Sequence, residues 1–335
     1  MDPRGKRFLV VGGAGFIGSH LVEELTRIDV KEIIVYDNLC RGSEENLAQA
    51  LRDPRVTFFE TGADILHRDM LDKAMRGVDG VFHLAALWLL HCQEYPRSAF
   101  DVNIGGTFNV FESAMANNVS RIVYSSSASV YGDALQEPMT EEHPHNNQNF
   151  YGATKIAGEN MLRALYFMRA KSPAPFTYAG LRYMNVYGPR QDYRGAYIAV
   201  IMKMLDRIDK GLPPVIYGDG SQAYDFIYVG DCAKANVLAM AADAREGFYN
   251  VGTGIKTSLK QLAFMVLEAA GSDLKPQFEP AGVTFVKNRV GCPAKAEREL
   301  SFKASMPLLE GLRNLVNWRK DHIERSALKT GKNKA

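Results

Sequence analysis

The sequence predicts an α/β fold with a parallel, doubly wound sheet. Short apolar runs alternate with amphipathic segments of helical period along most of the chain, and this alternation is typical of parallel strands connected by helices. The first apolar run, 8–11, leads directly into a Gly-x-x-Gly-x-x-Gly motif that begins at Gly12. The second run, 32–36, ends in Asp37, about 20 residues after that motif. These three observations predict a ligand site at the ends of the first two strands.

The composition is that of an ordinary globular protein. With 335 residues, of which 46% are hydrophobic and 23% charged, the chain can bury the core of one large domain or of two smaller ones that share a cleft. The net charge of +2 gives no reason to expect a nucleic-acid partner. No apolar run reaches transmembrane length, and residues 1–7 lead straight into a strand without a signal segment. We therefore expect a cytoplasmic protein without a membrane partner.

The cysteines and histidines do not predict a metal site. The four cysteines are far apart and form no Cys-x-x-Cys: Cys40, Cys92, Cys232 and Cys292. We interpret them as reduced thiols of a cytosolic protein. The closest histidine pair, His143 and His145, lies in a polar segment without a nearby cysteine, so zinc binding there is the less favoured alternative.

The glycine motif predicts a binding site for a diphosphate. Without a Cβ, the glycines allow the chain to turn tightly and to approach a phosphate closely. The segment that follows carries apolar residues at Ile17, Leu21 and Leu25, the period of an amphipathic helix. The free N–H groups and the positive dipole end of this helix would face the diphosphate.

Asp37 predicts which dinucleotide binds. A carboxylate at this position can accept hydrogen bonds from the ribose hydroxyls of NAD and would repel the 2′-phosphate of NADP. Arg41 lies close by in the sequence and keeps NADP as an alternative. We therefore expect NAD as the cofactor.

Tyr151 and Lys155 are candidates for acid–base chemistry. Residues four apart share one face of a helix, and an ammonium favours ionisation of a neighbouring phenol. A phenolate placed in this way could take a proton from a sugar hydroxyl. The spacing alone also fits a solvent-facing pair on an ordinary helix. The glycine motif and the serines at 125–127, which end an apolar run, favour the functional interpretation.

Together these motifs resemble the extended short-chain dehydrogenase/reductase superfamily, on its nucleotide-sugar epimerase/dehydratase branch. The resemblance covers roughly 7–319 and implies a Rossmann sheet with a smaller C-terminal lobe that binds the substrate. Further strands are expected at 56–60, 80–86, 121–127 and 176–182, and helices at 98–117 and 150–169. The implied division is 1–182 with about 225–255 for the NAD-binding domain, 183–224 and 256–325 for the substrate lobe, and 326–335 for a disordered tail.

The resemblance implies that Ser127, Tyr151 and Lys155 are catalytic. The segment that follows Ser127 matches the 4-epimerase form of the motif, because it has Ala128 and Ser129 where dehydratases have an acidic pair and decarboxylases a glutamate. We expect a nucleotide-sugar 4-epimerase that oxidises C4 transiently to a 4-keto sugar and reduces it again, with UDP-hexoses as substrates. The alternatives are a nucleotide-sugar dehydratase or decarboxylase, and a non-catalytic NAD-binding sensor.

The same resemblance assigns binding residues for both ligands. Those for NAD are Gly12, Gly15, Phe16, Ile17, Gly18, Asp37, Asn38, Asp64, Ile65, Leu84, Ala85, Ala86, Asn103, Ser125, Tyr151, Lys155 and Met184. Those for the nucleotide sugar are Ser127, Asn185, Val215, Tyr217, Tyr224 and Arg289.

The sequence departs from the family pattern at two positions. Tyr224 stands where relatives commonly have an arginine that holds the substrate phosphates, so the positive charge is lost there and phosphate binding must depend more on Arg289. Trp88 lies where relatives are more polar, and it could line the sugar site or simply pack. The identity of the sugar stays open.

The helices expected at 98–117 and 150–169 are amphipathic. They resemble the pair that forms a four-helix interface in members of the superfamily, which implies a homodimer. The alternative is that these faces pack only within the chain.

Overall fold

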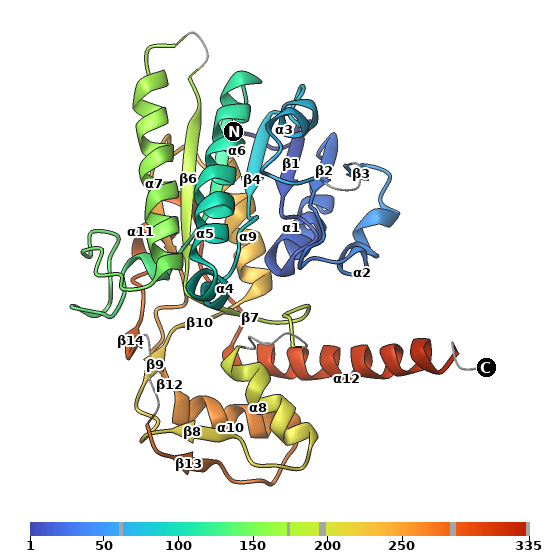
Figure 1. Cartoon of the computed structure of the whole chain (residues 1–335), viewed down its shortest axis with the longest axis vertical. Coiled ribbons are helices and arrows are strands. Elements are labelled where there is room, and N and C mark those ends of the chain that lie inside the picture. Colours follow the sequence, from blue (N-terminus) through green and yellow to red (C-terminus); the bar gives the residue numbers. More distant parts are fainter. Residues whose placement is uncertain (60–62, 173–174, 194–198, 282–285, 333–335) are drawn as a thin grey trace.

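The computed structural model describes residues 1–59, 63–172, 175–193, 199–281 and 286–332, and it is built on a seven-stranded sheet (Figure 1). The strand order is β11-β6-β5-β4-β1-β2-β3, and every neighbouring pair is parallel. The strands are β1 Arg7–Val11, β2 Glu32–Tyr36, β3 Val56–Phe58, β4 Gly80–His83, β5 Arg121–Ser127, β6 Thr177–Tyr183 and β11 Phe248–Val251. This architecture confirms the predicted Rossmann-like α/β fold.

Helices cover both faces of the sheet, and each face has its own hydrophobic cluster. Because side chains of a strand alternate between faces, Phe8 and Val10 of β1 belong to one cluster, and Leu9 and Val11 to the other. The first face carries α1 Phe16–Thr26 and α9 Val229–Ala241, which pack against each other, and α2 Glu44–Leu47 with η1 Ala50–Arg52 beside them. The second face carries α3 Arg68–Ala74, α6 Thr107–Ala116 and α7 Phe150–Arg169 (Figure 1).

The segment expected as one helix at 98–117 is divided in the structure. It follows α4 Leu89–Glu94 and consists of α5 Pro96–Ala99, a π-helical stretch η2 Phe100–Gly106, and α6. Within the π-helical stretch, the Asn103 side chain bonds the backbone of Leu87. A Cβ at Gly106 would lie 2.6 Å from Ile65, so close packing keeps this position free of a side chain.

A third hydrophobic cluster lies away from the main sheet, in the part drawn at the bottom of Figure 1. We call this part, formed by α8, α10, α12 and the short strands around them, the smaller lobe. Its helices are α8 Val200–Asp209, α10 Leu259–Ala270 and α12 Leu308–Lys332. Its strand pairs are β8 Val215–Tyr217 with β13 Gln277–Glu279, and β9 Ala223–Tyr224 with β12 Thr257–Ser258 and β14 Asn288–Arg289. Strands β7 Asn185–Tyr187 and β10 Phe226–Tyr228 pair between the two parts, and α11 Ala294–Leu300 and η3 Ala128–Val130 complete the elements.

The C-terminal tail differs from the sequence-based expectation. The expectation for 326–335 is disorder, but α12 continues to Lys332 and residues 333–335 lie outside the described part. The helix is anchored by Leu312 and Leu315 in the third cluster and by an ion pair between the buried Arg319 and the partly exposed Asp206. Once anchored, a helix can extend at little further cost, because each added residue contributes one hydrogen bond.

The described residues contain neither a membrane-crossing helix nor a metal-binding cluster. None of their helices combines the length and the apolar character that crossing a bilayer requires. No group of three or more histidine, cysteine, aspartate or glutamate side chains among them is arranged to hold a metal ion.

Candidate active site

A cavity of about 750 Å³ opens at the carboxyl ends of the central strands. Its walls come from the glycine loop after β1, the loop after β2, the end of β4, the end of β5 and the start of α7. The strand order reverses between β1 and β4, and ligands of doubly wound sheets bind at such a reversal.

The glycine loop leaves room for a phosphate group. Gly12 has a φ of +84° and a Cβ there would lie 2.5 Å from the Ala85 nitrogen, while a Cβ at Gly18 would lie 2.1 Å from the Gly12 oxygen. At Gly15 a Cβ would meet only the Gly12 oxygen, at 3.3 Å, and Gly15 lines the cavity. Helix α1 starts at the next residue without a side-chain cap, so its first N–H groups can bind an anion.

Asp37 lies at the end of β2 and lines the same cavity. Its carboxylate accepts hydrogen bonds from the backbone N–H groups of Ala14, at 2.9 Å, and Leu39, at 2.8 Å. Burial raises the pKa of Asp37, and these two bonds act in the opposite direction. Each carboxylate oxygen has a second lone pair, which is the acceptor that a ribose hydroxyl requires. Beside it, the Asn38 amide donates to the Asp64 carboxylate at 2.8 Å.

The cavity brings together most of the residues assigned to NAD from the sequence. Those that line it are Gly12, Gly15, Phe16, Ile17, Gly18, Asp37, Asn38, Asp64, Ile65, Leu84, Ala85, Ala86, Ser125, Tyr151 and Lys155.

Two residues assigned to NAD do not line the cavity. The buried Asn103 amide accepts from the Leu87 nitrogen at 2.7 Å, and it donates to the Leu87 oxygen and to Thr154. Asn103 therefore holds the loop after β4 against α7. Met184 packs where a Cβ on Gly252 or Gly291 would collide with it. Contact of either residue with the cofactor stays a prediction.

Ser127, Tyr151 and Lys155 meet where β5 ends and α7 begins. The Asn149 side chain accepts from the Gly152 nitrogen at 2.8 Å and caps α7, which fixes the turn that carries Tyr151. One turn later, the buried Lys155 ammonium donates to the Ser125 carbonyl at 2.8 Å. Its Nζ lies 5.6 Å from the centre of the Tyr151 ring.

The surroundings of Tyr151 act on its ionisation in opposite directions. Burial raises its pKa to about 12, and hydrogen bonding to Ser127 and the charges of Arg41 and Arg289 lower it only in part. The tyrosine is therefore a phenol at neutral pH in the protein alone. A neighbouring ammonium favours the phenolate, whereas the loss of hydration acts against the charged form.

Burial changes the pKa of Lys155 in the opposite direction. Burial lowers its pKa to about 8, and Cys92 and the Glu159 carboxylate act to raise it. The ammonium is therefore lost as the pH rises through about 8, well below the ordinary lysine range.

Arg289 is a buried cation beside this centre. Its side chain donates to the Gly132 carbonyl at 3.4 Å, and its Nε has no hydrogen-bond partner among the described residues. Burial lowers its pKa to about 10. In the part of the chain that the structure describes, no carboxylate forms an ion pair with it, although the charge of Asp133 acts on it. A buried cation with a free donor favours an anionic ligand.

None of the residues assigned to the substrate lines the cavity, and apart from Ser127 they lie on short strands. Tyr224, on β9, donates its hydroxyl to the Val286 carbonyl at 2.7 Å. Asn185, on β7, donates to the Asp225 carbonyl at 3.3 Å. Val215 and Tyr217 lie on β8 in the smaller lobe, and Tyr217 is 53% exposed. Their contacts with a nucleotide sugar stay predictions.

The structure adds cavity residues that the sequence-based assignment omitted. The Arg41 guanidinium lies 3.9 Å from the centre of the Trp88 ring, and its Nη2 lies 3.5 Å from the Asp192 carboxylate. All three residues line the cavity, so Trp88 lines the ligand site and also packs. Its indole N–H is buried without a partner among the described residues. The departure from the family pattern at Trp88 was a usable signal, whereas nothing in the sequence marked Asp192.

The glycine loop, the uncapped helix and the polar strand ends define a dinucleotide-binding α/β enzyme with a tyrosine–lysine pair. Residues 8–252 match the NAD dependent epimerase/dehydratase family, and the chain belongs to it. NAD is its cofactor, and the open space at Gly15 and the free lone pairs of Asp37 fit this dinucleotide.

Relatives of this chain include epimerases from several organisms. The UDP-glucose 4-epimerase of Mycolicibacterium smegmatis is 33% identical, over 93% of this chain and 98% of the relative. A solved UDP-N-acetylglucosamine 4-epimerase from Methanobrevibacter ruminantium is 33% identical with a TM-score of 0.87, over 95% and 99% of the two chains. The Thermus thermophilus UDP-glucose 4-epimerase, solved with NAD, is 33% identical with a TM-score of 0.81, over 93% and 99%.

Trp88 should report on the occupancy of the cavity. The chain has two tryptophans, Trp88 and Trp318, and only Trp88 lines the cavity. We expect NAD added to protein stripped of dinucleotide to change the tryptophan emission. The change should persist in Trp318→Phe and disappear in Trp88→Phe. A response that follows Trp318 instead would contradict the placement of Trp88.

Proposed function

We propose that this enzyme is a nucleotide-sugar 4-epimerase that inverts C4 of a UDP-hexose. The observation that carries the proposal is the trio Ser127, Tyr151 and Lys155, of which Tyr151 and Lys155 line the cavity. Ser127 is followed by two residues without a carboxylate. Those two, Ala128 and Ser129, are buried. Elimination of water from the sugar would need an acid beside the serine, so a dehydratase is the less favoured alternative. Relatives with dehydratase and decarboxylase names exist at 28% and 30% identity, which is why the reaction itself needs a test.

NAD supplies a hydride acceptor during oxidation of C4 and a hydride donor during its reduction, and its oxidised ring adds a positive charge that favours a nearby anion. Tyr151 takes the proton of the C4 hydroxyl as a phenolate and returns it after inversion. Ser127 hydrogen-bonds the same oxygen and lowers the pKa of the tyrosine. Lys155, held by the Ser125 carbonyl, contributes an ammonium that favours the phenolate.

Inversion also needs the sugar to turn while its diphosphate stays bound. The buried Arg289 guanidinium can hold the diphosphate, because its Nε is free and it lacks an acidic partner among the described residues. The hydroxyl of Tyr224 is engaged by a backbone carbonyl. In this proposal, Arg289 anchors the substrate and the Tyr151 centre acts on whichever face the sugar presents.

The reaction is tested by incubating the protein with UDP-glucose, UDP-N-acetylglucosamine or UDP-glucuronate and following the anomeric protons by NMR. We expect the C4 epimer of at least one of them. Tyr151→Phe should abolish turnover and still retain NAD, because only the hydroxyl is removed. A 4-keto-6-deoxy or pentose product would instead identify a dehydratase or a decarboxylase.

Arg289 should contribute more to phosphate affinity than Tyr224. A charge-assisted hydrogen bond contributes about 1.5–3 kcal/mol and a neutral one about 1 kcal/mol. We therefore expect Arg289→Ala to raise the KM by about ten- to a hundredfold, and Tyr224→Phe to raise it only severalfold. Steady-state kinetics with the UDP-sugar decide this, and equal effects of the two variants would refute the assignment.

We propose a homodimer formed through the faces of η2, α6 and α7. Large apolar side chains are exposed there, including Phe100, Phe108 and Phe167 at 47%, 38% and 56% exposure. Light scattering at micromolar concentration should give a dimer. Phe108→Lys should shift it towards the monomer, whereas Phe264→Lys, at a comparably exposed position on α10, should not. A monomeric wild-type protein would contradict the proposal.

A further inference from the structure

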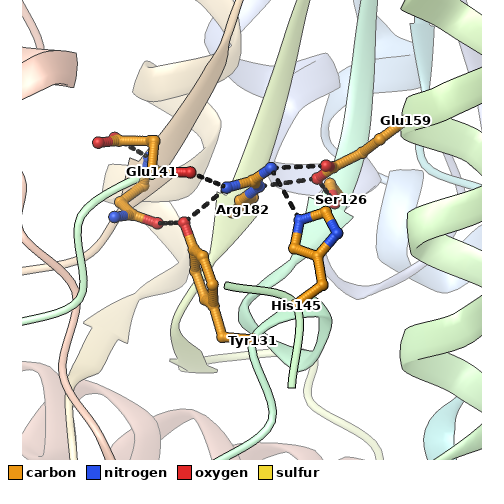
Figure 2. A network of polar contacts seen from close by, with 7 residues as sticks. Ser126, Tyr131, Glu141, His145, Glu159 and Arg182 are labelled. Carbon is orange, nitrogen blue, oxygen red and sulfur yellow. Dashed lines mark hydrogen bonds and ion pairs between the residues drawn. The ribbon is translucent and has the colours of Figure 1, made fainter. Parts of the chain in front are cut away.

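A buried carboxylate, Glu159, joins helix α7 to two strands of the sheet (Figure 2). It receives two hydrogen bonds from the Arg182 guanidinium, one from Nε at 2.8 Å and one from Nη2 at 2.7 Å. The Ser126 hydroxyl donates to it at 2.5 Å. The side chains of Glu159 and Arg182 are only 3% and 4% exposed. One carboxylate therefore connects α7 with β5, through Ser126, and with β6, through Arg182.

The other end of the Arg182 guanidinium also donates hydrogen bonds (Figure 2). Its Nη1 donates to the Tyr131 hydroxyl at 2.8 Å and to the Glu141 carbonyl at 3.0 Å. The Tyr131 hydroxyl in turn donates to the Asn250 side chain of β11 at 2.7 Å. A buried ion pair of this kind is held in place by its hydrogen bonds, and removal of one partner leaves an uncompensated charge. The network therefore fixes Glu159 against the sheet.

The position of Glu159 on α7 connects this network to the candidate active site. Residues 151, 155 and 159 lie at intervals of four, so their side chains share one face of the helix. Along β5, Lys155 bonds the carbonyl of Ser125 and Glu159 bonds the hydroxyl of Ser126. The next residue of the strand is Ser127. These hydrogen bonds to two adjacent residues of the strand thus fix the position of α7 along β5.

We propose that Glu159 is a positioning residue, which holds α7 in the register against β5 that places Tyr151 beside Ser127. The proposal rests on the catalytic role given to Tyr151 and Lys155 in the proposed function. Acid–base catalysis depends on hydrogen-bond distance, and a displacement of about 1 Å can reduce a rate a hundredfold. Glu159 itself does not line the cavity, so it acts through the helix.

The charge of Glu159 has a second effect, on Lys155. Burial lowers the pKa of Lys155 to about 8, and Glu159 acts to raise it. The other titratable groups that face the ammonium are Cys92, Tyr124, Tyr151 and His83. None of them is charged at neutral pH, because burial raises the pKa of Cys92, Tyr124 and Tyr151 and lowers that of His83. Without the Glu159 charge, the pKa of Lys155 falls further and the ammonium is lost at a lower pH.

The test compares two substitutions at Glu159. Glu159→Gln keeps the shape and removes the charge, and Glu159→Asp keeps the charge and shortens the side chain. We expect kcat to fall at least tenfold in both, with the KM for the nucleotide sugar changed less than twofold. The alkaline limb of the kcat–pH profile should move to lower pH in Glu159→Gln and stay in place in Glu159→Asp. A wild-type kcat and pH profile in Glu159→Gln would overturn the proposal.

Two controls separate positioning from loss of stability and from failure of the catalytic assignment. Asp206→Asn removes one acid of the Arg319 ion pair in the smaller lobe. It should lower the Tm without moving the alkaline limb, and a limb moved by Asp206→Asn would count against the proposal.

If Glu159→Gln does not fold, Ser126→Ala tests the proposal instead, because it deletes the hydrogen bond between Ser126 and Glu159 and keeps the ion pair. A wild-type kcat in Ser126→Ala would overturn the proposal. Turnover in Tyr151→Phe would refute the proposed function, whereas an inactive Tyr151→Phe beside an unaffected Glu159→Gln would refute the positioning role alone.

Discussion

The packing of helix α7 on strand β5 is the contact on which the candidate active site depends. The strand supplies Ser127 at its carboxyl end, and the helix supplies Tyr151 and Lys155 from its first two turns. Neither element alone brings these groups together. The Lys155 bond to the strand carbonyl and the Glu159 bond to Ser126 join the two elements at adjacent residues. The chemistry of the site therefore depends on the register of α7 against β5, and buried polar contacts determine this register.

Loss of hydration is the second constraint. It raises the pKa of Tyr151, lowers that of Lys155 and leaves Arg289 as a buried cation without an acidic partner among the described residues. The charge of Arg289, and a phenolate at Tyr151, are unfavourable in the protein alone. A bound anion at Arg289, or a positive charge near Tyr151, would stabilise these charges. Burial of these ionisable side chains thus favours the binding of charged ligands.

The sheet topology explains why residues far apart in the sequence share one cavity. Parallel strands end at the same edge, and the order reverses between β1 and β4, so the loops that follow these strands diverge and leave a crevice. Arg41, Trp88 and Asp192 reach this crevice from three separate segments. Strands β7 and β10 lead from the crevice toward the smaller lobe, whose own core is separate. The strands of the main sheet accordingly come from separate parts of the sequence.

The sequence by itself determined what depends on local spacing. The glycine motif, the acid at Asp37 and the Tyr151–Lys155 interval each require only neighbours a few residues apart, and the structure shows the corresponding turn, strand end and helix. The alternation of strands and helices gave the fold class for the same reason.

Only the tertiary structure decided burial and contacts between distant segments. The Tyr151–Lys155 interval does not indicate how strongly burial raises the pKa of the tyrosine, because hydration depends on the whole fold. The pattern at 98–117 predicts a helix, but it does not indicate the π-helical stretch in which the Asn103 amide bonds the distant Leu87 loop. The stacking of Arg41 on Trp88 joins loops that lie 47 residues apart, and no local pattern encodes such a contact, because long-range contacts form only when the complete sheet brings the loops together.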